Sequence, residues 1–161
     1  MSPDRRASRG RPFLRSVRFG IAFGAAIGFA SVPGALWIRG TIDSDLGLAL
    51  LLFGAGAIAA GFLTSLLVNQ WGAGLSKASR LALAVLSLVV LTAGFDALFL
   101  YFNYISYYVQ WWPDPFTSHW FFTAISTFLG VSYYYVTIAV PMLIPVGLPV
   151  VFGFGLIAAR R

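Results

Sequence analysis

The sequence lacks cysteine and glutamate altogether, and it has a single histidine, His119. Without thiols and with one imidazole, the chain cannot build Fe–S clusters, disulfides or the usual zinc sites. Charge is scarce as well, since 10% of the residues are charged whereas 59% are hydrophobic. Soluble domains are about 45–50% apolar and about 25% charged. The composition therefore indicates an integral membrane protein, and we expect it to hold no metal and no cofactor.

Apolar runs of membrane-spanning length follow one another along the chain. Each of the first three is about 20 residues long, which is enough to cross a hydrocarbon core of about 30 Å. They cover residues 19–38, 46–68 and 81–101. The connectors between them, 39–45 and 72–80, are short and polar, as expected for turns at a membrane surface. These runs predict three transmembrane helices.

The segment 119–159 is apolar nearly throughout, which is too long for one span and short for two. Its first part has polar or small residues on one helical face: His119, Thr123, Ser126, Thr127 and Gly130. We therefore predict an all-α integral membrane protein with four transmembrane helices, the last over about 134–157, plus one outer interfacial amphipathic helix. The alternative is five spans, in which 119–138 and 141–158 cross separately.

Basic residues are concentrated at the N-terminus, because six of the eleven Lys and Arg residues lie within residues 1–18. We expect this segment to be a disordered cytoplasmic arm against anionic lipid, with no nucleic acid as partner, followed by a single helical bundle over 19–161. With the arm inside, ten basic residues are cytoplasmic in the four-span form, and Arg39 alone is external. The positive-inside rule then predicts a multi-pass protein of the cell (inner or plasma) membrane with both termini cytoplasmic.

Aromatic and small residues give two further expectations. Tryptophans lie at the predicted span ends, which indicates an aromatic belt at the membrane interfaces. Small residues recur at intervals of four in the first span and lie also in the second: Gly20, Gly24, Gly28, Ala26, Ala30 and Gly61. This pattern predicts close helix packing of the glycine-zipper type. The contacting helix belongs to the same chain, to a second copy or to another membrane protein.

Asp96 is the acidic residue that falls inside a predicted span, where a carboxylate is expensive unless it has a partner or a function. We consider it a candidate site for an ion, a proton or a ligand, with Asn103, His119 and Thr137 as further polar candidates. Its expected partners include Thr92, one turn back, and a tyrosine hydroxyl. The alternative is a structural hydrogen bond near the headgroups.

The last predicted helix contains prolines at intervals of four residues: Pro141, Pro145 and Pro149. Each proline lacks an N–H and displaces the carbonyl group four residues earlier, so we expect a kink and unpaired carbonyl oxygens. In lipid such groups need partners, and interrupted helices of this kind line the ion sites of several transporter folds.

No catalytic constellation is visible, because the sequence has one histidine and no acid pair on a shared predicted face. We therefore expect no enzyme activity. The favoured function is that of a non-catalytic accessory or interaction subunit of a membrane assembly. The alternative is a small ion or solute transport module that uses Asp96 and the proline-broken last helix. The two differ in whether Asp96 has to face the interior of the bundle.

Overall fold

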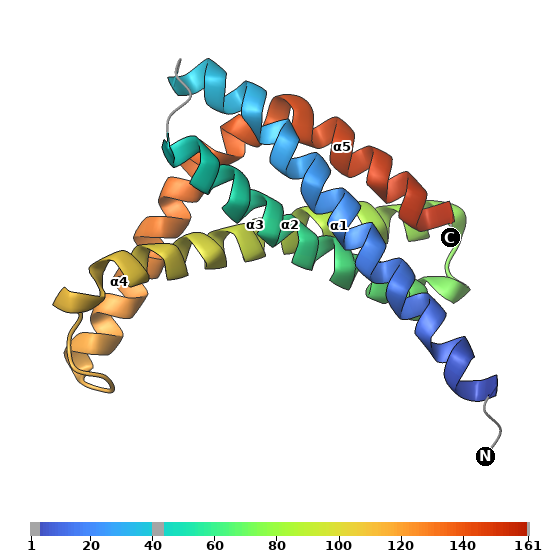
Figure 1. The fold of residues 1–161 in the computed structure, drawn as a ribbon, viewed down its shortest axis with the longest axis horizontal. Helices are drawn as coiled ribbons and strands as arrows, with labels where there is room; N and C mark the ends of the chain where they lie inside the picture. The colour runs from blue at the N-terminus through green and yellow to red at the C-terminus, as the bar shows by residue number, and fades with distance from the viewer. Residues whose placement is uncertain (1–3, 40–43, 161) are drawn as a thin grey trace.

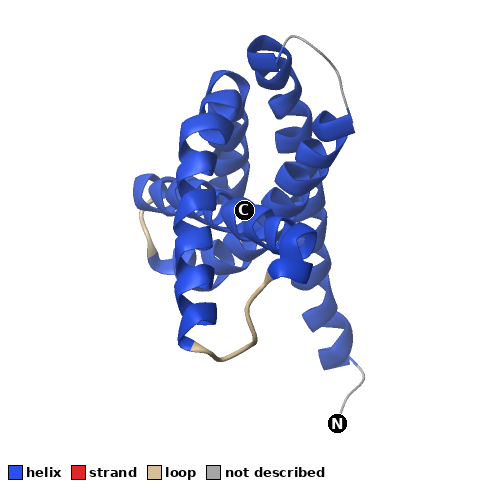
Figure 2. Ribbon diagram, turned by 90° about the vertical axis from the view of Figure 1, so that its left-hand side faces the viewer, coloured by secondary structure: helices blue, strands red, loops and turns tan. Residues whose placement is uncertain are grey.

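The computed structural model describes residues 4–39 and 44–160 (Figure 1). Figure 2 shows that this part of the chain is helical apart from short loops, with no strand in it. The elements are, in chain order, α1 (Asp4–Arg39), α2 (Ser44–Trp71), the 3-10 turn η1 (Gly72–Gly74), α3 (Lys77–Tyr108), the 3-10 turn η2 (Val109–Trp111), α4 (Ser118–Tyr134), the π-helical turn η3 (Tyr135–Ala139) and α5 (Val140–Arg160).

The predicted all-helical class is confirmed, and four of the described helices are long and apolar enough to cross a membrane. Their apolar segments are Phe13–Gly34, Leu50–Gly74, Lys77–Tyr108 and Leu143–Arg160. The helix α4, with 17 residues, is not among them. These four apolar helices are compatible with a multi-pass membrane protein.

The four long helices form a ring in which each one packs against two neighbours. Helix α2 lies between α1 and α3, and α5 closes the ring between α3 and α1. The interior contains buried apolar side chains from all four, among them Phe23, Ala57, Leu88 and Val151. The start of α1, the end of α5 and the α2–α3 connector lie toward the same end of this ring (Figure 1). An even number of crossings would place them in this way.

Helices α1 and α2 come into very close contact at glycines. A Cβ atom on Gly20 would lie 2.7 Å from the carbonyl oxygen of Ile58, and one on Gly24 would lie 2.6 Å from that of Gly54. A Cβ atom on Gly61 would lie 3.0 Å from the Cα atom of Gly20, whereas Gly28 has ordinary contacts. The other small positions of α1 differ in burial, since Ala30 is buried and Ala26 is half-buried. The glycines that the sequence singled out thus lie at a contact within the chain.

The backbone of α1 is helical from Asp4, within the N-terminal segment that we expected to be disordered up to residue 18. Contacts with α2 hold its later part in place. The hydroxyl groups of Ser16 and Ser65 lie 2.9 Å apart in a buried hydrogen bond, and the rings of Phe13 and Phe62 meet edge to face at 5.6 Å. A count of charges does not reveal such contacts. Residues 1–3 of this predicted N-terminal segment lie outside the described residues.

The last turns of α3 and the whole of α4 extend beyond the ring as a pair (Figure 1). The Tyr101 hydroxyl donates to the Ala124 carbonyl at 3.4 Å, and the Tyr101 ring contacts Phe128 at 5.6 Å. Helix α4 begins at a Thr117 cap, whose side-chain oxygen accepts the backbone N–H of Trp120 at 3.1 Å. From here on, the arm means this α3–α4 pair and not the basic N-terminal segment.

A π-helical turn connects α4 to α5 without a loop, near the start of the fourth span that we expected over about 134–157 with a kink at its prolines. The backbone N–H of Val140 donates to the carbonyl of Tyr135, five residues earlier. Pro141 follows at once and has no N–H to continue the α-helical pattern. The chain changes direction between α4 and α5 (Figure 1), as expected where a π turn and a proline coincide.

Candidate functional site

Asp96 faces the interior of the molecule, with 1% of its surface exposed. The residues that precede it by one and two turns in α3, Thr92 and Leu88, are buried on the same face of the helix. The backbone of α2 lies directly against the carboxyl group, because Gly56 has no side chain. A Cβ atom on Gly56 would collide with Asp96 Oδ1 and would lie 3.0 Å from both Asp96 Cγ and the Asp96 backbone nitrogen.

The two oxygens of Asp96 have different surroundings. Oδ2 accepts a hydrogen bond of 3.3 Å from the Tyr135 hydroxyl. Oδ1 is buried and has no hydrogen-bond partner in the part of the chain that the structure describes, and the same holds for Thr92 Oγ1. A buried polar group without a partner costs about 1–3 kcal/mol, and more when it is charged. We name Asp96, Tyr135, Thr92 and Gly56 the carboxyl cluster.

The π turn places Tyr135 in this cluster. Tyr135 is the first residue of the turn and is 4% exposed, and its ring packs against Phe53 of α2 with centroids 6.4 Å apart. Smaller apolar side chains of α3 and α5, including Ala93 and Leu143, complete the packing around the two rings. The carboxyl cluster therefore joins α2, α3 and the start of the bent α4–α5 segment.

A small cavity of about 130 Å³ adjoins the cluster between α3 and α5. Thr92 and Tyr135 contribute to its wall, which is otherwise made of apolar side chains and Gly147. The side chains that the structure describes include no group of three or more His, Cys or acidic residues that could hold a metal. The chemistry that this arrangement offers is that of one buried carboxyl with one free oxygen.

The other polar candidates from the sequence do not join Asp96. Asn103 lies two turns further along α3, in the arm, where its backbone carbonyl oxygen accepts a hydrogen bond from the Ser106 hydroxyl. His119 is exposed in the first turn of α4. Thr137 is exposed in the π turn, and its hydroxyl donates to the carbonyl oxygens of Tyr133 at 2.9 Å and Tyr134 at 3.3 Å.

The expected tyrosine partner of Asp96 is thus Tyr135, which the sequence did not single out among the tyrosines. The contact of Gly56 with the carboxyl group was not predicted. Nothing in the sequence pattern indicates that these two residues meet, since they are 79 positions apart. Comparisons with protein families, curated proteins and solved structures give no match.

Proposed function

We propose that the protein is a small multi-pass ion transport module of the cell membrane, with Asp96 as its ion-binding group. The observation that supports this proposal is the position of Asp96, which is 1% exposed and lies against Gly56 of α2 and Tyr135 of the π turn. A carboxyl group is expensive in such a place and marks an ion or proton pathway more often than a purely structural contact. This alternative is therefore preferred here to the accessory role that the sequence favoured.

A proton is the ion that suits this geometry best. Calcium takes six to eight oxygen ligands and magnesium six, whereas the carboxyl cluster supplies the Asp96 oxygens and the hydroxyls of Tyr135 and Thr92. A proton needs one carboxyl oxygen, and it removes the charge that makes burial costly. Asp96 Oδ1, which has no other partner in the described chain, is the atom that would take and release it.

The test is proton flux into liposomes that contain the purified protein and a pH-sensitive dye, driven by a potassium diffusion potential. We expect flux in the wild-type protein and its loss in Asp96→Asn, because the amide still accepts the Tyr135 hydrogen bond and exchanges no proton. The matched control is Asp114→Asn, the same change at an exposed position between η2 and α4, which should conduct normally. Absence of flux in the wild-type protein, or equal flux in all three, would contradict the proposal.

Orientation is part of the same proposal. Both termini and the α2–α3 connector would be cytoplasmic, with the basic N-terminal residues against anionic lipid. Of the basic side chains described at this end, Lys77 and Arg160 are exposed and Arg80 is half-buried. The protein would carry out no covalent chemistry, in keeping with its single histidine and its lack of thiols.

An accessory role in a membrane assembly is the second candidate function, and the surface of the arm favours it. Large aromatic side chains of the arm and its connecting loop are each at least 68% exposed: Tyr107, Trp111, Phe116 and Phe122. Aromatic residues are enriched where proteins bind one another. The partner would be another membrane protein or a second copy.

Photocrosslinking from position 122 in native membranes tests the accessory role. A crosslinked product of defined mass should form there and not from Leu86, which is exposed on the part of α3 that lies in the ring. A product of twice the chain mass would identify a second copy as the partner. Equal labelling from both positions would indicate lipid-facing surfaces and contradict the role.

A further inference from the structure

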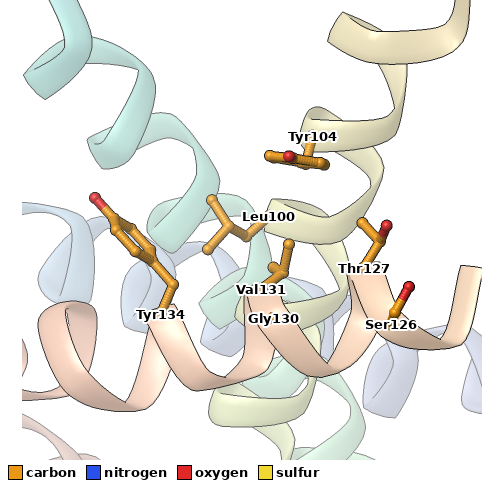
Figure 3. Close-up of a pocket in the computed structure, with 7 residues that line it drawn as sticks. All are labelled: Leu100, Tyr104, Ser126, Thr127, Gly130, Val131 and Tyr134. Carbon is orange, nitrogen blue, oxygen red and sulfur yellow. The ribbon is translucent and has the colours of Figure 1, made fainter. Parts of the chain in front are cut away.

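The arm encloses a cleft between α3 and α4 that the proposed function does not use. Its volume is about 520 Å³, within the range of about 300–1,000 Å³ that is usual for small-molecule sites. Figure 3 shows the residues that line it: Leu100 and Tyr104 from α3, and Ser126, Thr127, Gly130, Val131 and Tyr134 from α4. Its inner end adjoins the carboxyl cluster, since Leu100 follows Asp96 by one turn and Tyr134 precedes Tyr135.

The walls combine an apolar floor with hydroxyl groups. Leu100, Val131 and the bare backbone of Gly130 supply the floor (Figure 3). The hydroxyl groups of Tyr104, Thr127 and Tyr134 form no hydrogen bond within residues 4–39 and 44–160. No lining residue is charged. A ligand of these walls is therefore neutral, with an apolar body and several oxygens that accept and donate hydrogen bonds.

The orientation of α4 supports a binding role for the cleft. The small and polar face of α4 that the sequence revealed lines the cleft through Ser126, Thr127 and Gly130 (Figure 3). Large apolar side chains lie exposed on other faces of the helix: Phe121, Phe122, Ile125 and Leu129. A helix in this orientation offers its hydrogen-bonding groups to whatever fills the cleft.

We propose that the α3–α4 cleft binds a neutral amphiphile whose head is a hydroxyl-bearing ring, such as the sugar of an uncharged glycolipid. Hydroxyl groups on a ring match the free hydroxyls of Tyr104, Thr127 and Tyr134, because each can donate and accept. Tyrosine rings beside the cleft offer flat apolar surfaces to the ring, and the Leu100–Val131 floor suits the first carbons of the apolar chain. The site is independent of proton transfer at Asp96.

Gly130 permits a direct test, because a Cβ atom on it would meet nothing within 4 Å. Gly130→Leu therefore fills the cleft without a clash against the protein, and a helix gains stability when glycine is replaced. Gly94→Leu is the matched control, since Gly94 is also helical, exposed and free of neighbours within 4 Å, but lies outside the cleft. Equal thermal stability of the two variants would show that both fold.

The probe is dioleoylglycerol that carries a single glucose, and its binding is measured by native mass spectrometry against phosphatidylglycerol and phosphatidylcholine with the same acyl chains. We expect the wild-type protein and Gly94→Leu to retain the glucosyl lipid, and Gly130→Leu to bind it about tenfold more weakly. Thr127→Ala should weaken binding as well, without a loss of stability, because it removes a hydroxyl that has no partner in the described chain.

Three results would overturn the proposal. One is equal retention of the three lipids, which would mean that the head is not recognised. Another is stronger retention of phosphatidylglycerol, which would mean that the site prefers an anion. The third is undiminished binding in Gly130→Leu. Asp96→Asn should bind the glucosyl lipid normally, so that failure of the transport proposal and failure of the lipid site are told apart.

Discussion

The contact between Gly56 and Asp96 permits a quantitative prediction. Gly56→Ala adds one methyl group where it would collide with Asp96 Oδ1, and the backbone nitrogen of Asp96 at 3.0 Å leaves little room for α3 to yield. Overpacking of this kind costs about 1–3 kcal/mol. If the carboxyl group turns away, its hydrogen bond to Tyr135 is lost as well, which costs about 0.5–1.5 kcal/mol.

Gly54→Ala is the matched control for this change, two residues earlier in the same helix. Its Cβ atom would lie 3.6 Å from the Gly24 carbonyl oxygen, an ordinary contact. Both variants gain about 1 kcal/mol of helix propensity, which cancels between them. We therefore expect Gly56→Ala to be less stable than Gly54→Ala by about 2–4 kcal/mol, measured by circular dichroism during unfolding in mixed micelles with increasing sodium dodecyl sulfate.

Equal unfolding of the two variants would refute the reasoning. A further check repeats Gly56→Ala and Gly54→Ala in a protein that also carries Asp96→Ala. This third change removes the carboxyl group that Gly56→Ala would meet. The cost of Gly56→Ala should then fall, because residues in direct contact show coupling energies of about 0.5–3 kcal/mol. An undiminished cost would mean that the methyl group is opposed by something other than the carboxyl group.

Three further predictions concern packing, the hydrogen bond and the orientation. Gly24→Ala should destabilise the protein by about 1–3 kcal/mol, because a Cβ atom on Gly24 would meet the side chain of Ile58. Gly28→Ala should not destabilise it, because a Cβ atom on Gly28 would have its nearest neighbour at 3.6 Å. A similar cost for both in the unfolding assay would contradict the close contact at Gly24. Tyr135→Phe keeps the ring but leaves Asp96 Oδ2 without its donor, so stability should fall by about 1–3 kcal/mol and proton flux should fall with it. A reporter enzyme fused after residue 161 should be active in the cytoplasm and one inserted near residue 114 outside the cell, and an external C-terminus would support the five-span alternative.

The long apolar helices could be predicted from the sequence because each one is a local property, a run of apolar residues long enough to cross a hydrocarbon core. The intervals of four between glycines in the first span are local in the same sense, and the structure places Gly20 and Gly24 at a close contact. Their partner could not be predicted, since small residues occur on two faces of α1 and in α2. Which faces meet is decided by the whole bundle.

The carboxyl cluster lay beyond sequence reasoning for the same reason. Asp96 stands out by its type, whereas its partner Tyr135 is one of seven tyrosines. The choice depends on the π turn, which widens the helix just before Pro141. A proline predicts that a helix is disturbed near it, but not whether the helix bends, ends or gains a residue in one turn.

The π turn also fixes how α4 and α5 are rotated relative to each other about the helix axis. A π turn holds one residue more than the α-helical turn it replaces, and each residue of an α-helix turns the chain by about 100°. Helix α5 can therefore present one face to the ring while α4 presents its hydroxyl face to the cleft. Deletion of a single residue from the turn would shift α4 by about 100° in phase relative to α5. A deletion of one residue would thus change the orientation of the α4 hydroxyl face relative to the face that α5 presents to the ring. A substitution in either helix alters only one of these two faces.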